Sequence, residues 1–124
     1  MAIEQMRKDG EDPLILDAGD LFFSTTNINK NNLKSEKHRC ETMLAAYEMI
    51  GCDGLNIGKY ELLAGLGYLK SMRKKYAGIN FISANLRHKV TNELIFSPYK
   101  IIKKDNLNIG VIGLTNMAPD SMKS

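Results

Sequence analysis

Two carboxylates follow directly on a short apolar run near the start of the chain. Asp17 and Asp20, separated by Ala18 and Gly19, come after the run Leu14–Leu16. A continuous apolar run of this length is typical of a buried parallel strand, and the loops after such strands bind ligands in open α/β sheets. Asp20 is therefore the first candidate for a functional residue. Because Asp and Gly are also ordinary turn residues, the alternative is a turn or helix cap, and this stretch leaves both open.

The elements that would position these carboxylates alternate between helix and strand. Helices are predicted over Ala2–Lys8, from Ser35 to Ile50 and from about Glu61 to Tyr76, and strands over Leu14–Leu16, Asp53–Ile57, Ile79–Ser83, Tyr99–Lys103 and Asn108–Leu114. The early alternation predicts an α/β fold with a mostly parallel sheet flanked by helices. The last two strands form an antiparallel hairpin, since Asp105 and Asn106 tolerate the positive φ of a tight turn.

Three details of the helices follow from individual residues. Ser35 is the expected N-cap of the second helix, and Gly51 is expected to end it. Gly65 and Gly67 lie inside the predicted third helix, so its first half is expected to be bent or closely packed. The apolar stripe of the second helix recurs at three- and four-residue steps, at Cys40, Met43, Leu44, Tyr47 and Ile50.

Composition places the chain among ordinary globular domains. It has 124 residues, of which 44% are hydrophobic and 25% charged, with a net charge of +3. The basic residues are scattered without interleaved aromatics, which argues against nucleic-acid binding. No apolar segment approaches the roughly 18 residues of a membrane-spanning helix. Cys40 and Cys52 flank one helix, too far apart for a disulfide, and are expected to be free, buried or half-buried small hydrophobic residues.

The first element begins abruptly, without a cap or a preceding strand. We therefore expect residues 1–124 to be one truncated domain, with the remainder of a parent chain on either side. A sheet cut in this way has an unpaired edge, and exposed edges recruit partners. A homodimer or strand exchange through the exposed sheet edge is the expected consequence.

Four segments together resemble the calcineurin-like metallophosphoesterases, in the branch of 5′-nucleotidases and UDP-sugar hydrolases. The segments are Leu16–Phe22, Met49–Gly58, Phe81–Leu86 and Ile109–Thr115. The resemblance implies that the chain is part of an α/β/β/α sandwich. It also points to a periplasmic or extracellular parent protein.

In that family two divalent metals (Mn, Zn, Co or Mg) activate a water that attacks phosphorus. Asp20 matches the carboxylate that bridges the metals. The family's Gly-Asn-His-Glu motif, however, is replaced by Gly58-Lys59-Tyr60-Glu61. A protonated Lys59 has no acceptor and its charge repels a cation, while Tyr60, with an ordinary pKa near 10, replaces a histidine poorly.

The departure in this motif predicts a catalytically silent fragment that holds no metal of its own. Lys59 is expected to pair with Asp20 in place of a cation. One alternative is an active phosphohydrolase, acting on a nucleotide or UDP-sugar, for which the parent chain supplies the missing ligands. Another is a non-catalytic nucleotide- or sugar-binding or interaction module, in which Asp17 and Asn85 face the ligand.

Overall fold

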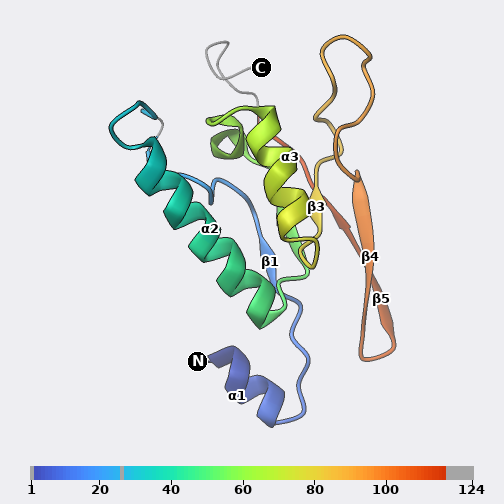
Figure 1. The fold of residues 1–124 in the computed structure, drawn as a ribbon. Helices are drawn as coiled ribbons and strands as arrows, with labels where there is room; N and C mark the ends of the chain where they lie inside the picture. The colour runs from blue at the N-terminus through green and yellow to red at the C-terminus, as the bar shows by residue number, and fades with distance from the viewer. Residues whose placement is uncertain (1, 26, 117–124) are drawn as a thin grey trace.

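The computed structural model describes residues 2–25 and 27–116, which form two small sheets with helices beside them (Figure 1). The parallel sheet has the strand order β1-β2-β3, from Leu16–Asp17, Gly54–Asn56 and Phe81–Ile82. An antiparallel hairpin of β4 (Tyr99–Lys104) and β5 (Leu107–Ile112) makes the second sheet. The predicted α/β fold, with a parallel sheet first and a hairpin last, is confirmed.

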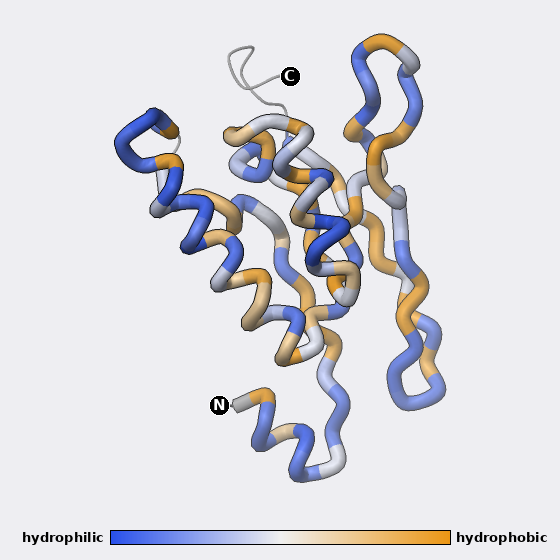
Figure 2. Tube along the Cα trace, viewed as in Figure 1, coloured by the Kyte–Doolittle hydropathy of each residue, from blue (hydrophilic) through white to orange (hydrophobic). Residues whose placement is uncertain are grey.

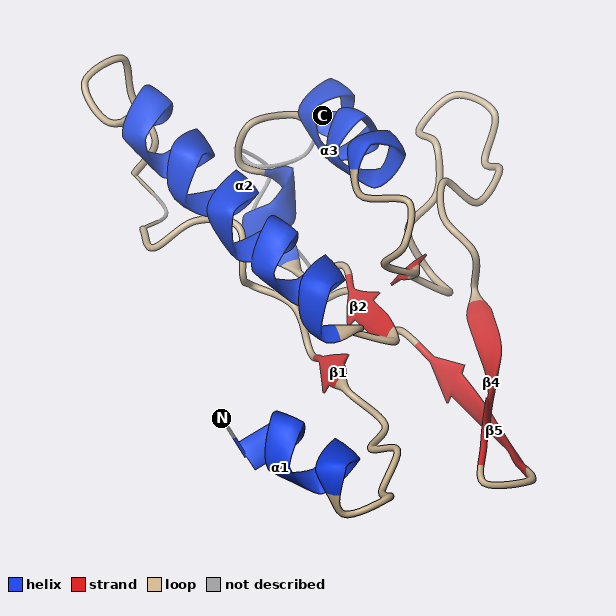
Figure 3. Cartoon of the chain, turned by 60° about the horizontal axis from the view of Figure 1, so that its bottom comes forward, coloured by secondary structure: helices blue, strands red, loops and turns tan. Residues whose placement is uncertain are grey.

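The two long helices, α2 (Leu33–Ile50) and α3 (Leu66–Lys75), share one side of the parallel sheet. The first helix, α1 (Ala2–Lys8), contacts the end of α2, and a short 3-10 helix, η1 (Lys59–Leu62), lies between β2 and α3 in the chain. Both α2 and α3 pack on the sheet face that carries Leu55 and Phe81, through Cys40 and Leu44 of α2 and Leu69 and Met72 of α3. Figure 3 shows the hairpin lying apart from these two helices.

Several turns were predicted correctly from the residues that form them. Gly51, the predicted end of the second helix, has a φ of +79°, as expected for glycine in a left-handed C-terminal cap. Gly10, with a φ of +83°, takes the same conformation after α1. Asp105 and Asn106 have φ values of +48° and +68°, which make the two-residue hairpin turn. The predicted free thiols are confirmed, since both cysteines are buried and unpaired.

The strand predicted at Leu14–Leu16 is shifted and less buried than expected. The structure places β1 at Leu16–Asp17, and the Leu16 side chain is 47% exposed. The reason is that β1 is the edge strand of the sheet, and Leu16 lies on the face opposite the helices, beside Gly54. The helices cover only the other face.

The predicted starts of the two long helices were also wrong. The second helix begins at Leu33, because Asn29 and Asn32 build the preceding turn with their side chains, and Ser35 lies within the first turn. Figure 2 shows this Asn-rich loop as a hydrophilic segment before α2. The predicted helix from Glu61 to Tyr76 is divided at Gly65, whose φ of +90° interrupts the helix, so α3 starts at Leu66.

The segment after β5 crosses over the parallel sheet and connects the two sheets. The amide of Ala84 donates to the Gly113 carbonyl (2.7 Å), so this segment lies beside the end of β3. A Cβ on Gly113 would lie 2.5 Å from Asn56 Oδ1 and 2.7 Å from the Ile82 carbonyl oxygen. Only glycine allows this close crossing. Among the described residues, no helix has the length and apolar character needed to cross a membrane.

Replacing Gly113 with alanine should destabilise the fold, because the added methyl group overpacks the contact between the two sheets. Overpacking of this kind costs about 1–3 kcal/mol. Gly67 is the matched control: a Cβ there meets nothing within 4 Å, and the residue lies in α3. Gly67→Ala should therefore stabilise by up to about 1 kcal/mol. Urea unfolding measures both changes, and an unchanged unfolding free energy for Gly113→Ala would contradict the prediction.

Candidate functional site

The loop after β1 meets the loop after β2 at the carboxyl end of the sheet. Gly19 has a φ of +101°, and a Cβ there would lie 2.5 Å from the Asn56 carbonyl oxygen. A Cβ on Gly58 would lie 2.5 Å from Asp20 Oδ1 and 2.8 Å from the Asp20 nitrogen. Two glycines thus let the loops touch backbone to backbone. Asp20 itself has a φ of +57°, which is uncommon for a residue with a side chain.

A buried carboxylate holds this contact together. The Glu61 side chain is fully buried (0% exposed), and its two oxygens accept the amides of Asp20 and Leu21, both at 2.9 Å. In return, Asp20 Oδ1 accepts the amide of Tyr60 at 3.0 Å. The two acidic residues therefore cross-link the loops, each carboxylate accepting from the other loop's backbone.

Burial makes the charge of Glu61 costly. Burial raises the pKa of Glu61 to about 7, and the amide donors of Leu21 and Asp20 offset only part of this increase. The nearby charge of Asp20 adds a smaller increase in the same pKa. The Glu61 carboxyl group therefore exchanges its proton near neutral pH.

A second glutamate, Glu36, binds the same loop at Ser24, three residues after Leu21. Glu36 of α2 is buried and accepts both the hydroxyl and the amide of Ser24. The hydroxyl of Ser24 is the main reason that the pKa of Glu36 is lowered. Between the two glutamates, Leu21–Phe23 is buried in the core. Segment 20–24 is thus fixed by carboxylates at both ends and by apolar packing between them.

The ion pair predicted between Lys59 and Asp20 is not formed. No ion pair joins the two residues in the part of the chain that the structure describes. The Lys59 ammonium instead lies 5.8 Å from the centroid of the Tyr60 ring. The adjacent Tyr60 ring offers the ammonium a cation–π contact in place of the ion pair.

The other two candidates are hydrogen-bonded within the protein. Asp17 accepts the Gly19 amide at 2.8 Å and the Tyr47 hydroxyl at 2.7 Å. Burial, together with the hydrogen bond to Asp17, raises the pKa of Tyr47 to about 12. Asn85 exchanges two hydrogen bonds with the backbone of Thr115, at 2.8 and 2.9 Å. Their roles as ligand-facing residues stay predictions.

Sequence reasoning missed the polar residues that tie the sheet ends together. Asn56 Nδ2 donates to the carbonyls of Ala18 (3.0 Å) and Leu114 (2.8 Å). Thr115 Oγ1 donates to the Ile57 carbonyl and contacts Ser83 Oγ, both at 2.6 Å. The available signal was positional, since each of these polar residues lies in or directly after an apolar strand.

Among residues 2–25 and 27–116, no three His, Cys, Asp or Glu side chains come together to hold a metal ion. Asp20, Tyr60 and Glu61 do come together, but the two carboxylates accept hydrogen bonds from backbone amides, including that of Tyr60. The arrangement serves to fix two loops against each other.

No family model matches the chain. Protein UshA of Salmonella pullorum is 33% identical over 97 residues, 78% of this chain. The 5′-nucleotidase of Vibrio cholerae is 32% identical over 117 residues, 91% of this chain. The solved structure of a 5′-nucleotidase precursor from Thermus thermophilus superposes with a TM-score of 0.73, at 26% identity, over 91% of this chain and 21% of that one.

The chain matches a segment of the 5′-nucleotidase branch of the metallophosphoesterases. This confirms the resemblance drawn from the four sequence segments. The 5′-nucleotidase-like chain spans about a fifth of the curated relatives that it matches: 18% of the Salmonella protein and 20% of the Vibrio protein. A calcineurin-like phosphoesterase, YfkN of Bacillus subtilis, shares the fold, with a TM-score of 0.64 at 20% identity over 92% of this chain and 38% of that one.

The raised pKa of Glu61 predicts a measurable dependence of stability on pH. Its folded pKa of about 7 exceeds the ordinary value of 4.5, so the folded chain binds this proton more tightly than the unfolded chain. The resulting stabilisation is complete below the unfolded pKa and is lost as the pH rises through 7. Between about pH 5 and about pH 7.5 it amounts to about 2 kcal/mol.

Urea unfolding of the wild type and of Glu61→Gln at these two pH values tests this expectation, because other titrating groups cancel in the comparison. The wild type should lose more stability than the glutamine variant as the pH is raised. Identical losses in the two proteins would show that Glu61 does not titrate in this range.

Proposed function

We propose that this 5′-nucleotidase-like segment is catalytically silent and serves as a structural element of its fold. The observation that carries the proposal is that the motif Gly58–Glu61 binds the backbone of the neighbouring loop. Glu61, the one residue of the motif's last three positions that agrees with the family, accepts two backbone amides with its two oxygens. The other two positions carry Lys59 and Tyr60.

The donor set around Asp20 does not fit a pair of divalent cations. Hard cations of this kind need several carboxylate, imidazole, amide or water ligands placed close together. Here one exposed carboxylate remains, and one of its oxygens accepts the Tyr60 amide. A protonated lysine at position 59 supplies no lone pair and adds a positive charge.

Protein hydrogen bonds support the loop geometry in a way that requires no metal. The Gly19 amide is satisfied by Asp17, the Asp20 and Leu21 amides by Glu61, and the Ala18 carbonyl by Asn56. Each of these partners belongs to the described chain. The internal satisfaction of these four backbone groups favours a structural role for the loop over a ligand-binding one.

A phosphatase assay of the chain with Mn²⁺, Co²⁺ or Zn²⁺ tests the proposal. Neither a nucleoside monophosphate nor an aryl phosphate should be hydrolysed above the rate of a matched Asp20→Asn variant. Asn at position 20 keeps the side-chain shape but removes the negative charge of the candidate metal ligand. Any contaminating phosphatase would act equally in both samples.

Metal-dependent hydrolysis that disappears in Asp20→Asn would contradict the proposal and favour the active alternative. Calorimetric titration with nucleotides addresses the binding-module alternative. Heat at millimolar nucleotide that is lost in Asp17→Asn or Asn85→Ala would favour a nucleotide-binding role over a purely structural one.

A further inference from the structure

The two strands of the hairpin differ sharply in charge. β4 has the sequence Tyr-Lys-Ile-Ile-Lys-Lys, with lysines at 100, 103 and 104. β5 has the sequence Leu-Asn-Ile-Gly-Val-Ile, with no charged residue and no proline. Natural edge strands are commonly protected from pairing by lysine, proline or bulges. The β4 edge has this protection and the β5 edge lacks it.

The free edge of β5 can be identified from the turn. Leu107 lies opposite Lys104 across the two-residue turn, and in such hairpins this first pair is hydrogen-bonded. Because the pattern alternates, the backbone groups of Asn108, Gly110 and Ile112 point away from β4. No other strand among the described residues pairs with β5 on that side.

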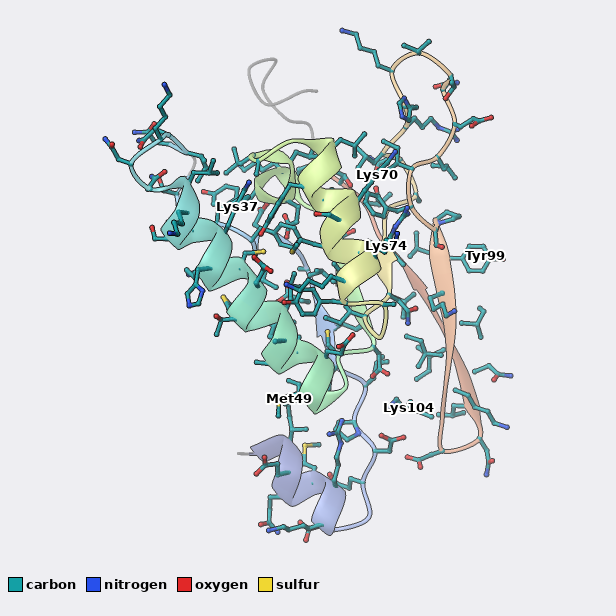
Figure 4. The ribbon with its side chains drawn as sticks, in the orientation of Figure 1. Lys37, Met49, Lys70, Lys74, Tyr99 and Lys104 are labelled. Atoms are coloured by element: carbon teal, nitrogen blue, oxygen red, sulfur yellow. The ribbon has the colours of Figure 1, made fainter. Side chains whose placement is uncertain are left out.

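An apolar stripe runs alongside this free edge. Tyr99 and Ile112 are cross-strand partners, and Ile101 lies on the same face of the hairpin, with exposed fractions of 56%, 70% and 55%. Figure 4 shows the Tyr99 side chain pointing away from the body of the molecule. Leu16 and Leu114 continue the stripe at 47% and 65% exposure.

The stripe continues into a groove of about 380 Å³ between β5 and the parallel sheet. Leu16, Ile112 and Leu114 all line the groove, together with Ile82 and Asn56 of the sheet face opposite the helices. Parallel sheets are normally covered on both faces. In the described chain, therefore, a sheet face that carries no helix adjoins an unprotected strand edge.

We propose that β5 pairs antiparallel with β5 of a second copy of this chain about a two-fold axis at Gly110. The pairing would form one continuous sheet of four strands, with both lysine-bearing β4 strands at its outer edges. A two-fold axis brings the same edge of each copy together, so an uncharged edge can pair with itself. Pairing through β4 would instead place lysines of the two copies against each other.

The register of this dimer follows from the axis at Gly110. Asn108 of one copy lies opposite Ile112 of the other, and the two Gly110 residues face each other as a hydrogen-bonded pair. The apolar stripes of both copies then meet on one face of the joined sheet. β1 offers a weaker alternative, since it has only two paired residues.

Sedimentation equilibrium and light scattering of the full chain over a range of concentrations test the proposal. The wild type should form dimers. The double variant Gly110→Lys, Ile112→Lys places like charges opposite each other at the axis, while the partners of these residues within the hairpin, Ile101 and Tyr99, are uncharged. It should raise the dimer dissociation constant by about tenfold or more. The control Met49→Lys makes the same kind of change at an 87% exposed apolar residue of α2 and should leave the constant unchanged.

A cross-linking variant keeps the test independent of the folding of the lysine variant. Facing residues of a hydrogen-bonded antiparallel pair have Cα atoms about 5.5 Å apart, within disulfide reach. A Cβ on Gly110 meets only the Ile101 side chain, at 3.7 Å, so the site accepts a cysteine. Mild oxidation of Gly110→Cys should give a covalent dimer, whereas Met49→Cys should not.

A wild type that stays monomeric at all concentrations would overturn the proposal. So would a dimer that survives the double lysine substitution and fails to cross-link at position 110, since its interface would then lie elsewhere. Larger assemblies that Leu16→Lys dissolves while the double variant does not would assign the contact to the groove and equally overturn pairing through β5.

Discussion

The buried carboxylate of Glu61 is the interaction on which the site geometry depends. Its two oxygens accept amides from consecutive residues of a loop 40 and 41 positions earlier in the chain. Unsatisfied buried amides cost about 1–3 kcal/mol each, so this side chain fixes the direction of the loop that carries Asp20. The same carboxylate is fully removed from solvent, which explains why its proton equilibrium lies near neutrality.

Other contacts at the sheet ends depend on the loop being held in this position. Gly19 and Gly58 permit the backbone approach, and Asn56 connects the Ala18 carbonyl to the Leu114 carbonyl of the crossing segment. The carboxyl ends of β1 and β2 and the segment after β5 therefore form one hydrogen-bonded unit. The arrangement keeps the architecture of a phosphoesterase segment, while the amides of Gly19, Asp20 and Leu21 donate to carboxylates of the protein itself.

The sequence predicted features whose cause is local. The hairpin turn, the glycine that ends α2 and the apolar stripe of α2 depend on neighbouring residues, and all three predictions were correct. It failed where the outcome depends on distant residues. Leu16 is exposed because the helices cover only one face of the sheet, and Glu61 matters because of amides in another loop.

Amide hydrogen exchange of Asp20, Leu21 and Tyr60 is the most direct test of a site held by protein rather than by metal. The three amides donate to Glu61 and Asp20, so the account predicts protection in metal-free buffer with chelator, unchanged by excess Mg²⁺ or Zn²⁺. Fast exchange of these amides without metal, followed by protection on adding either cation, would contradict it.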